Sequence, residues 1–295
     1  IHQAQLSSIV NGGVRAGRTN ISINQLLSIN VWHTHEREQK KISECLRSAG
    51  DLIDAQTRKL NALKTHKKGL TQQLFPRKDE PLPRLRFPEF QNHGEWEEHS
   101  FGDLVKIKPG RVFKTSEYSK TGIRLMQVQN VGCGVTKWNE NTVYLPETYA
   151  DEYPELVLRS DDIVLALYGS NSSDELKISR IPINESISIL YQRVGKIEIT
   201  NTSLRVDFAF QICRETIKDF IESKSIGNGQ PLAPLKELYA KKVYLPSSPE
   251  QHRIAHCLTD LDNLIILHTK KLEITKTHKE ALMQQLFPST NEVEV

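Results

Sequence analysis

The stretch EQKKISECLRSAGDLIDAQTRKLNALKTHKKGLTQQLFP, at residues 38–76, decides the organisation of this chain because the chain contains it twice. Residues 250–288 read EQHRIAHCLTDLDNLIILHTKKLEITKTHKEALMQQLFP, and the two copies align without a gap at an offset of 212, with 20 of 39 positions identical. Identity at half of the positions over so long a segment indicates an internal repeat, and therefore a duplicated structural unit.

Each copy has the spacing of a long amphipathic helix. In the first copy two sets of positions recur with a period of seven, at 42, 49, 56, 63 and 70 and at 46, 53, 60, 67 and 74. A 4-3 spacing held over about five heptads predicts a coiled coil. We expect the two helices to pack antiparallel within one chain as a rigid spacer. The polar seam positions, which cost stability and fix the register, are Gln56, Lys67, His268, Thr275 and Lys279.

The repeat continues faintly upstream of both helices, where Gly17 matches Gly229 and Ile23 matches Leu235 at the same offset. Residues 1–33 therefore resemble the end of the unit that precedes the second helix, with a short apolar strand expected around residues 26–32. Because the sequence has no initiator methionine, we expect its N-terminus to be truncated or processed. The expected order is the tail of one domain, a helix, a complete domain and a second helix.

Composition and pattern divide the chain into six segments. We expect the C-terminal remnant of a first domain at 1–33, spacer helix 1 at 34–76, a proline-rich basic linker at 77–95, a complete domain at 96–246, spacer helix 2 at 247–288 and a tail at 289–295. Within the complete domain, strands are expected at 123–131, 142–145, 162–168, 187–191, 194–199 and 242–245, and helices at 207–223 and 236–240. The fold class is therefore α+β, with a mixed domain and two long antiparallel coiled-coil spacer helices.

Composition excludes several classes of protein. A hydrophobic fraction of 38% with 25% charged residues is typical of a globular chain and not of a disordered one. No apolar run approaches the length of a membrane span, and no segment has the form of a signal peptide, so we expect a cytoplasmic protein. The four cysteines stand far apart without a C-x-x-C pair, which predicts reduced thiols and no zinc site.

Catalytic motifs are not evident. The chain has no P-loop, and its two G-x-G pairs lack the third glycine of a dinucleotide or adenosylmethionine loop. The acids Asp162 or Glu155, with Glu175-Leu176-Lys177, imitate the acid…E-x-K spacing of many nucleases, but the pattern is too short to be specific. We therefore expect no catalytic residue, metal or cofactor in this chain.

Three long polar connections, at 108–121, 169–180 and 223–234, have the length of functional loops. Basic side chains there and at nearby strand ends can neutralise phosphates, and amides or guanidinium groups can pair with base edges. Each residue alone is more often an ordinary surface or turn residue, so the grouping carries the prediction. The phosphate candidates are Lys108, Arg111 and Lys114. The base-reading candidates are Gln127, Gln129, Asn130, Asn171, Arg180, Arg193, Asn228 and Gln230.

The QQLFP helix ends, the E-Q-x-x-I-x-x-x-L helix starts and the PRLRFPEF segment at 83–90 resemble the DNA-specificity subunit of type I restriction–modification systems. That resemblance implies two target-recognition domains, each reading half of a split site in double-stranded DNA, held apart by two antiparallel helices. It implies a non-catalytic subunit that directs methyltransferase (modification) and restriction/translocase partners. Adenosylmethionine, Mg²⁺ and ATP would then be held by those partners.

Two alternatives remain open at this point. The first is a DNA-acting enzyme, a nuclease or methyltransferase fusion with an unrecognised site, which would act on DNA with Mg²⁺ or adenosylmethionine alone. The second is a coiled-coil protein-interaction scaffold, which would lack salt-dependent DNA affinity. Relative to the resemblance, most of the first recognition domain is missing. If the chain is naturally this short, self-association around a two-fold axis would predict an interrupted palindrome as its target.

Overall fold

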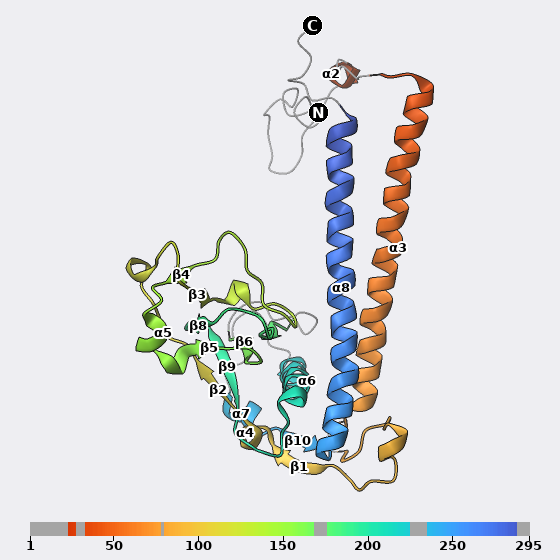
Figure 1. Ribbon diagram of the computed structural model, residues 1–295. Helices are drawn as coiled ribbons and strands as arrows, with labels where there is room; N and C mark the ends of the chain where they lie inside the picture. Colours follow the sequence, from red (N-terminus) through yellow and green to blue (C-terminus); the bar gives the residue numbers. More distant parts are fainter. Residues whose placement is uncertain (1–22, 28–32, 78–79, 168–175, 225–234, 288–295) are drawn as a thin grey trace. The chain divides into compact units, whose positions relative to one another are not determined.

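A computed structural model describes residues 23–27, 33–77, 80–167, 176–224 and 235–287 (Figure 1). The chain forms two compact units, residues 1–66 with 263–295 and residues 67–262. The two long helices, α3 (Glu36–Leu74) and α8 (Ser248–Leu286), contribute to both units. No described helix is long and apolar enough to cross a membrane.

Helices α3 and α8 run antiparallel, as the repeat predicts. In the first unit the ring Nδ1 of His268 lies 3.3 Å from Oε1 of Gln56. Further along, a Cβ added to Gly50 would meet the Lys279 ammonium at 3.3 Å. Residue numbers thus rise along one helix as they fall along the other. Each helix is 39 residues long, and each ends two residues before the proline that closes its repeat.

The segment before α3 differs from its prediction. Residues Ile23–Leu27 form a short helix, α2, so the expected strand around 26–32 is wrong for residues 26 and 27. A short apolar run is compatible with either structure when periodicity alone is used. Residues 28–32, and most of the expected remnant at 1–33, lie outside the described residues.

The second unit contains two four-stranded sheets and a two-stranded ribbon among its described residues. The first sheet has the order β2-β9-β6-β7 and is antiparallel throughout, with β2 (Val105–Pro109), β9 (Val194–Ile199), β6 (Ile163–Ala166) and β7 (Ile178–Arg180). The second has the order β4-β3-β8-β5, with β4 (Tyr144–Leu145), β3 (Ile123–Met126), β8 (Ser188–Leu190) and β5 (Val157–Leu158); β3 and β8 are parallel. The ribbon pairs β1 (Glu97–Ser100) with β10 (Lys242–Leu245).

Helices of 3 to 19 residues lie before and between the strands. The α-helices are α4 (Phe101–Leu104), α5 (Tyr149–Glu152), α6 (Val206–Lys224) and α7 (Leu235–Tyr239). The 3₁₀ helices are η1 (Pro88–Phe90), η2 (Thr115–Glu117), η3 (Val128–Asn130) and η4 (Pro154–Leu156). The expected strand at 123–131 is therefore wrong beyond Met126. There Asn130 accepts the Gln127 N–H at 3.0 Å and so favours a helical turn.

The first sheet is buried on both faces. Alternate residues of β6 point to opposite sides, as strand geometry requires. Ile163 and Leu165 join a cluster with Phe208 of α6, whereas Val164 and Ala166 join a cluster with the second sheet. The unbroken apolar run of β6 follows from this double burial. Truncating a fully buried phenylalanine such as Phe208 would cost about 3–5 kcal/mol.

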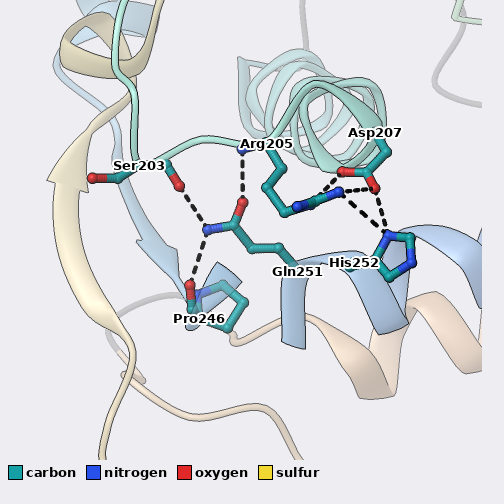
Figure 2. Close-up of polar contacts among 6 residues, drawn as sticks. All are labelled: Ser203, Arg205, Asp207, Pro246, Gln251 and His252. Atoms are coloured by element: carbon teal, nitrogen blue, oxygen red, sulfur yellow. Dashed lines mark hydrogen bonds and ion pairs between the residues drawn. The ribbon is translucent and has the colours of Figure 1, made fainter. Parts of the chain in front are cut away.

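The start of α8 is fixed by a buried polar cluster, shown in Figure 2. Gln251 is 1% exposed; its carbonyl oxygen accepts the Arg205 N–H at 2.9 Å, and its amide donates to the backbone oxygens of Ser203 and Pro246 at 2.9 and 3.0 Å. The loop before α6 is thus joined to the first turn of α8.

An ion-pair network on the α6 side extends this cluster. Arg205 binds the Asp207 carboxylate with two hydrogen bonds of 3.0 Å, and His252 Nδ1 lies 2.7 Å from the same carboxylate (Figure 2). Partial burial opposes ionisation of Asp207, but the hydrogen bonds from Arg205 and His252 prevail and lower its pKa to about 2. The carboxylate therefore stays charged throughout the neutral range.

The neighbouring Glu250 anchors the proline-rich segment that precedes the domain. Its two oxygens accept bonds of 2.8 and 2.7 Å from the Arg86 guanidinium, which also donates to the backbone oxygen of His93 at 2.8 Å. The guanidinium carbon of Arg253 also lies 4.6 Å from the centroid of the Phe87 ring. The segment at 83–90 is therefore held on the first turns of α8.

A second charged cluster joins α3, α6 and α8. Lys67 and Arg214 both contact the Asp262 carboxylate, and Arg214 does so at 3.2 Å. Burial and the Arg214 charge lower the pKa of Lys67 to about 8, although Asp262 opposes the shift. Burial opposes ionisation of Asp262, but the two cations hold its pKa below the usual value. Asp262 thus contacts both cations at this junction, and Glu215 lies 3.5 Å from Arg214 as a second anion.

Candidate nucleic-acid interface

Three connections meet at one edge of the second unit. Because β3 and β8 are parallel, their last residues Met126 and Leu190 lie at the same edge, and the Tyr191 N–H donates to the Met126 oxygen at 3.2 Å. Arg111 forms a parallel bridge with Tyr191. The Leu167 N–H donates to the Arg193 oxygen at 2.9 Å. We name residues 109–118, 127–129 and 191–193 the loop end.

Gly110 permits the chain after β2 to pass close to the end of β8 at the loop end. A Cβ on Gly110 would lie 2.4 Å from the Leu190 oxygen and 2.5 Å from its carbonyl carbon, which no side chain tolerates. The Gly110 N–H donates to the Val194 oxygen at 3.0 Å. The chain leaving β2 can therefore pass directly over the end of β8 and place Arg111 beside Tyr191.

Three aromatic rings form a cluster next to Arg111, which lies over two of them, and we name Phe113, Tyr149 and Tyr153 the aromatic shelf. Their centroids are 5.5–5.8 Å apart in all three pairings. The Arg111 guanidinium carbon lies 4.5 Å from the Tyr153 centroid, within cation–π distance. The stack gives an exposed arginine a defined orientation.

Glu117 ties the aromatic shelf to the loop that carries it. It accepts the Lys114 N–H at 2.6 Å and the Tyr149 hydroxyl at 3.1 Å. The Lys114 N–H, then the Tyr149 hydroxyl and the positive charge of Arg111, hold the pKa of Glu117 below its usual value. Glu117 is thus an anion that positions its neighbours.

Amide side chains occupy the adjacent turn. Gln129 donates to the Gln127 side-chain oxygen at 3.0 Å. Burial and then the hydrogen bond with Tyr191 raise the pKa of Tyr118, whose hydroxyl also bonds Gln127. Two amides with exposed surface and two tyrosines therefore form one polar set next to Arg111.

The sequence candidates divide by what their side chains contact. Lys108, in β2, forms an exposed pair with Glu198 at 2.7 Å. Lys114 is exposed on the loop itself, and Arg193 lies in the turn before β9. These three, with Arg111, Gln127 and Gln129, lie at or next to the loop end.

Two other candidates are engaged within the fold. Asn130 is 1% exposed and donates to the Lys137 oxygen at 3.0 Å, besides accepting the Gln127 N–H. Arg180 pairs with Asp161 at 3.0 Å and stands opposite Ile163, the end of β6 away from Leu167. Asn171, Asn228 and Gln230 lie outside the described residues.

The nuclease-like pattern has structural contacts where the structure describes it. Asp162 accepts the Arg159 N–H at 2.8 Å and pairs with Lys196 at 2.8 Å, which closes the turn before β6. Glu175 lies outside the described residues. In the described part of the chain, no group of three or more His, Cys, Asp or Glu side chains is placed to hold a metal ion.

Sequence reasoning missed the tyrosines and the aromatic shelf. Tyr149 and Tyr153 are four residues apart, a spacing that brings side chains together around a helical turn. That signal could have paired the two rings. It could not have joined them to Phe113, which is more than thirty residues away in the sequence.

Comparison with known proteins identifies relatives of this arrangement. Residues 93–276 match the family described as type I restriction modification DNA specificity domain. The chain is 32% identical over 254 residues to the type I restriction enzyme MjaVIII specificity subunit of Methanocaldococcus jannaschii, covering 85% of this chain and 59% of that protein. It is 29% identical over 208 residues to the type I restriction enzyme EcoAI specificity subunit of Escherichia coli, covering 69% of this chain and 34% of that protein.

Solved structures share the fold. The S subunit of a type I restriction-modification system from M. genitalium superposes with a TM-score of 0.60 at 17% identity, over 98% of this chain and 71% of that one. A chain from a type I R-M system solved for its assembly and conformational transition gives a TM-score of 0.54 at 13% identity, over 86% of this chain and 58% of that one. The chain thus spans well under two thirds of the length of the two curated relatives.

Proposed function

This chain belongs to the type I restriction–modification DNA specificity family, and on that premise we propose that it recognises a sequence in double-stranded DNA without catalysing a reaction on it. The observation that carries the proposal is the loop end, where cationic and amide side chains from three separate connections gather at one edge of the fold. Cations contribute affinity by neutralising phosphates, and amides and guanidinium groups contribute sequence preference.

The proposed contacts follow from the position of each side chain. Lys108 and Lys114 are proposed to meet phosphates, and Gln127, Gln129 and Arg193 to meet base edges. Asn130 and Arg180 are proposed to shape the turn and the sheet that support them. Asn171, Asn228 and Gln230 remain proposed contacts on the strength of the sequence.

The long helices are proposed to act as a ruler and as the surface for partner subunits. Their antiparallel seam supports this role, because a paired helix of 39 residues is a stiff element of defined length. The partners would be the methyltransferase and restriction/translocase subunits of a cytoplasmic type I system, and they would hold adenosylmethionine, Mg²⁺ and ATP. The full target would be bipartite, with this domain reading one half.

Selection from a randomised duplex DNA library tests the proposed function. The full chain, alone and with the modification subunit of its own system, is incubated with the library and the bound duplexes are sequenced. One short motif should be enriched. No enriched motif in either preparation would contradict the proposal, and methyl transfer or cleavage by the chain alone would show an enzyme instead.

Two matched lysine variants test the phosphate contact proposed for Lys114. Lys114→Ala should weaken binding to all duplexes and lower the salt slope by about one unit if one phosphate contact is lost. Lys276→Ala removes the same charge from an exposed position on α8 and serves as the control. Equal effects of the two variants would contradict a DNA contact at Lys114.

A further inference from the structure

We propose that Arg111 reads a guanine base in the DNA major groove, with the aromatic shelf as the support that holds its guanidinium group in position. This inference rests on the proposed function, because it assigns one base contact within the domain proposed to bind DNA. It changes the role that the sequence suggested, in which Arg111 was grouped with the phosphate-neutralising lysines.

The first support is the orientation of the side chain. Arg111 is exposed, yet its guanidinium carbon lies 4.5 Å from the Tyr153 centroid and 5.9 Å from that of Phe113. A guanidinium group stacked on aromatic rings keeps a defined plane. Because the donors are already ordered, less side-chain entropy is lost when they bind. A contact to phosphate alone does not require such order.

The second support is the rigidity of what lies beneath. Phe113 is 2% exposed, so the aromatic shelf is anchored in the core. Glu117 fixes the shelf from the other side through the Tyr149 hydroxyl at 3.1 Å. The Arg111 N–H donates to the Leu190 oxygen at 3.4 Å, so its backbone is joined to β8 as well. Both ends of the arginine are therefore held.

The third support is a contrast with Arg124, which is also stacked on an aromatic ring. Its guanidinium carbon lies 4.2 Å from the Trp138 centroid, but it donates to the Ser186 oxygen at 2.7 Å and lies 3.8 Å from Glu185. One of its terminal nitrogens is thus engaged inside the protein, and its Nε is buried. In the described part of the chain, no carboxylate lies within ion-pair distance of Arg111, although the charge of Arg111 acts on Glu117, and the Arg111 residue is exposed.

The chemistry of a stacked, exposed guanidinium group matches one base edge. Two parallel N–H donors fit the O6 and N7 acceptors of guanine, whereas adenine presents a donor where guanine presents O6. The same fork also fits a phosphate. The two ligands differ in consequence, because a guanine contact changes sequence preference and a phosphate contact changes affinity for every sequence.

The test uses the duplex selected by the full chain, with each guanine replaced in turn by 7-deazaguanine. This analogue lacks the N7 acceptor and keeps Watson–Crick pairing. Wild-type protein should lose roughly 5- to 150-fold in affinity at one position, the range expected when one donor is left without its acceptor. Arg111→Ala should bind weakly from the outset and show no further loss at that position. Arg111→Lys, which keeps the charge, should behave like Arg111→Ala.

Three further variants distinguish an effect on base recognition from an effect on folding. Tyr153→Leu should reduce the loss caused by 7-deazaguanine, and Tyr153→Phe should restore it, because the ring supports the arginine. Arg124→Lys removes a different stacked arginine, the one over Trp138. It should lower the melting temperature without changing which guanine matters, when binding is measured below the melting point.

Each outcome decides between the claims. If wild-type protein binds selected and scrambled duplexes alike, the proposed function fails. If wild-type protein prefers the selected duplex, and Arg111→Ala retains the full 7-deazaguanine effect at every position, only the guanine contact is overturned. If Arg111→Lys binds like wild-type protein and Arg111→Ala weakens all duplexes equally, Arg111 contacts phosphate and the inference is wrong.

Discussion

The two copies of the Glu-Gln motif begin helices α3 and α8 in different surroundings. Glu250 and Gln251 are each 1% exposed, and the first holds Arg86 while the second holds the Ser203–Arg205 loop. Glu38 and Gln39 are exposed. Gln39 donates to the Thr34 oxygen at 2.6 Å, which repeats the bond from Gln251 to the oxygen five residues before it.

The difference shows which contacts both copies of a repeated sequence form and which contacts depend on the rest of the chain. The bond to the residue five positions back needs only the glutamine and a backbone oxygen just before the repeat, so both copies form it. The bonds to Arg86 and to the Ser203–Arg205 loop depend on the segment between the copies, whereas Glu38 accepts a bond from the nearby Thr34 hydroxyl. Identical residues therefore contribute different amounts of stability.

Equivalent residues also differ in their surroundings where α3 packs against α8. Lys67 and Lys279 are equivalent positions, and so are Asp262 and Gly50, at the offset of 212. Lys67 faces the Asp262 carboxylate, whereas Lys279 faces Gly50. The buried ion pair beside α6 thus has no acid at the equivalent position, where a glycine takes its place.

The largest expected effect is at Glu250. Glu250→Gln should lower the free energy of unfolding by about 3–5 kcal/mol, because it leaves the Arg86 charge buried without its anion. Glu38→Gln removes an exposed charge near a helix start and should cost less than about 1 kcal/mol. Urea unfolding of both variants measures the two losses, and equal losses would contradict the comparison.

A loss of about 3 kcal/mol is expected for Asp262→Asn, because Lys67 then loses its ion-pair partner beside Arg214, which keeps only Glu215. Asp260→Asn, on the same helix but exposed, should change stability by less than about 0.5 kcal/mol. Urea unfolding near neutral pH, where Lys67 is mostly protonated, gives both values. A loss for Asp262→Asn no larger than that of its control would show that the cluster is unimportant.

Gln251→Ala should cost about 2–3 kcal/mol, since it leaves the Arg205 N–H and two backbone oxygens without their partner. Gln39→Ala deletes one exposed bond and should cost about 0.5 kcal/mol. Thermal unfolding of the matched pair compares them directly. If Gln251→Ala is as mild as Gln39→Ala, the buried cluster in Figure 2 does not hold α8 to the domain.

The smallest expected effect is a gain. Gly50→Asp restores the acid at the equivalent of Asp262 and removes a helix-interior glycine, so it should stabilise the protein by about 0.5–1 kcal/mol. The Lys279 ammonium at 3.3 Å from the new Cβ can shift to pair with it. Gly50→Asn also removes the glycine from the helix interior but adds no charge, so it is the control. If Gly50→Asp is no more stable than Gly50→Asn, the new aspartate forms no ion pair with Lys279.

Elements with local signals were predicted well. The heptads predicted α3 and α8 and their antiparallel pairing, and the strands at 194–199 and 242–245 agree with β9 and β10. Strands β1, β2, β5 and β7 were missed because they are two to five residues long, and β1 reads EEHS without an apolar pattern. A short polar strand exists only because a partner strand pairs with it.

The candidate site was predicted only in part, for the same reason. The sequence identified Arg111 in a long connection, and Gln127 and Arg193 in or next to expected strands, as separate residues of suitable chemistry. Their proximity depends on the parallel pairing of β3 and β8, which no local pattern encodes. The stack of Arg111 on Tyr153 depends on a contact across forty residues. Residue type was therefore predictable, and the arrangement was not.

The central claim is sequence recognition, and one ratio tests it most directly. The affinity of the wild-type chain, alone and with its modification subunit, is measured for the selected duplex and for a scrambled duplex of the same composition across a range of salt concentrations. Both affinities should fall with salt. At physiological salt the selected duplex should be preferred by at least about 10³-fold. A ratio near one at every salt concentration, in both preparations, would contradict the account.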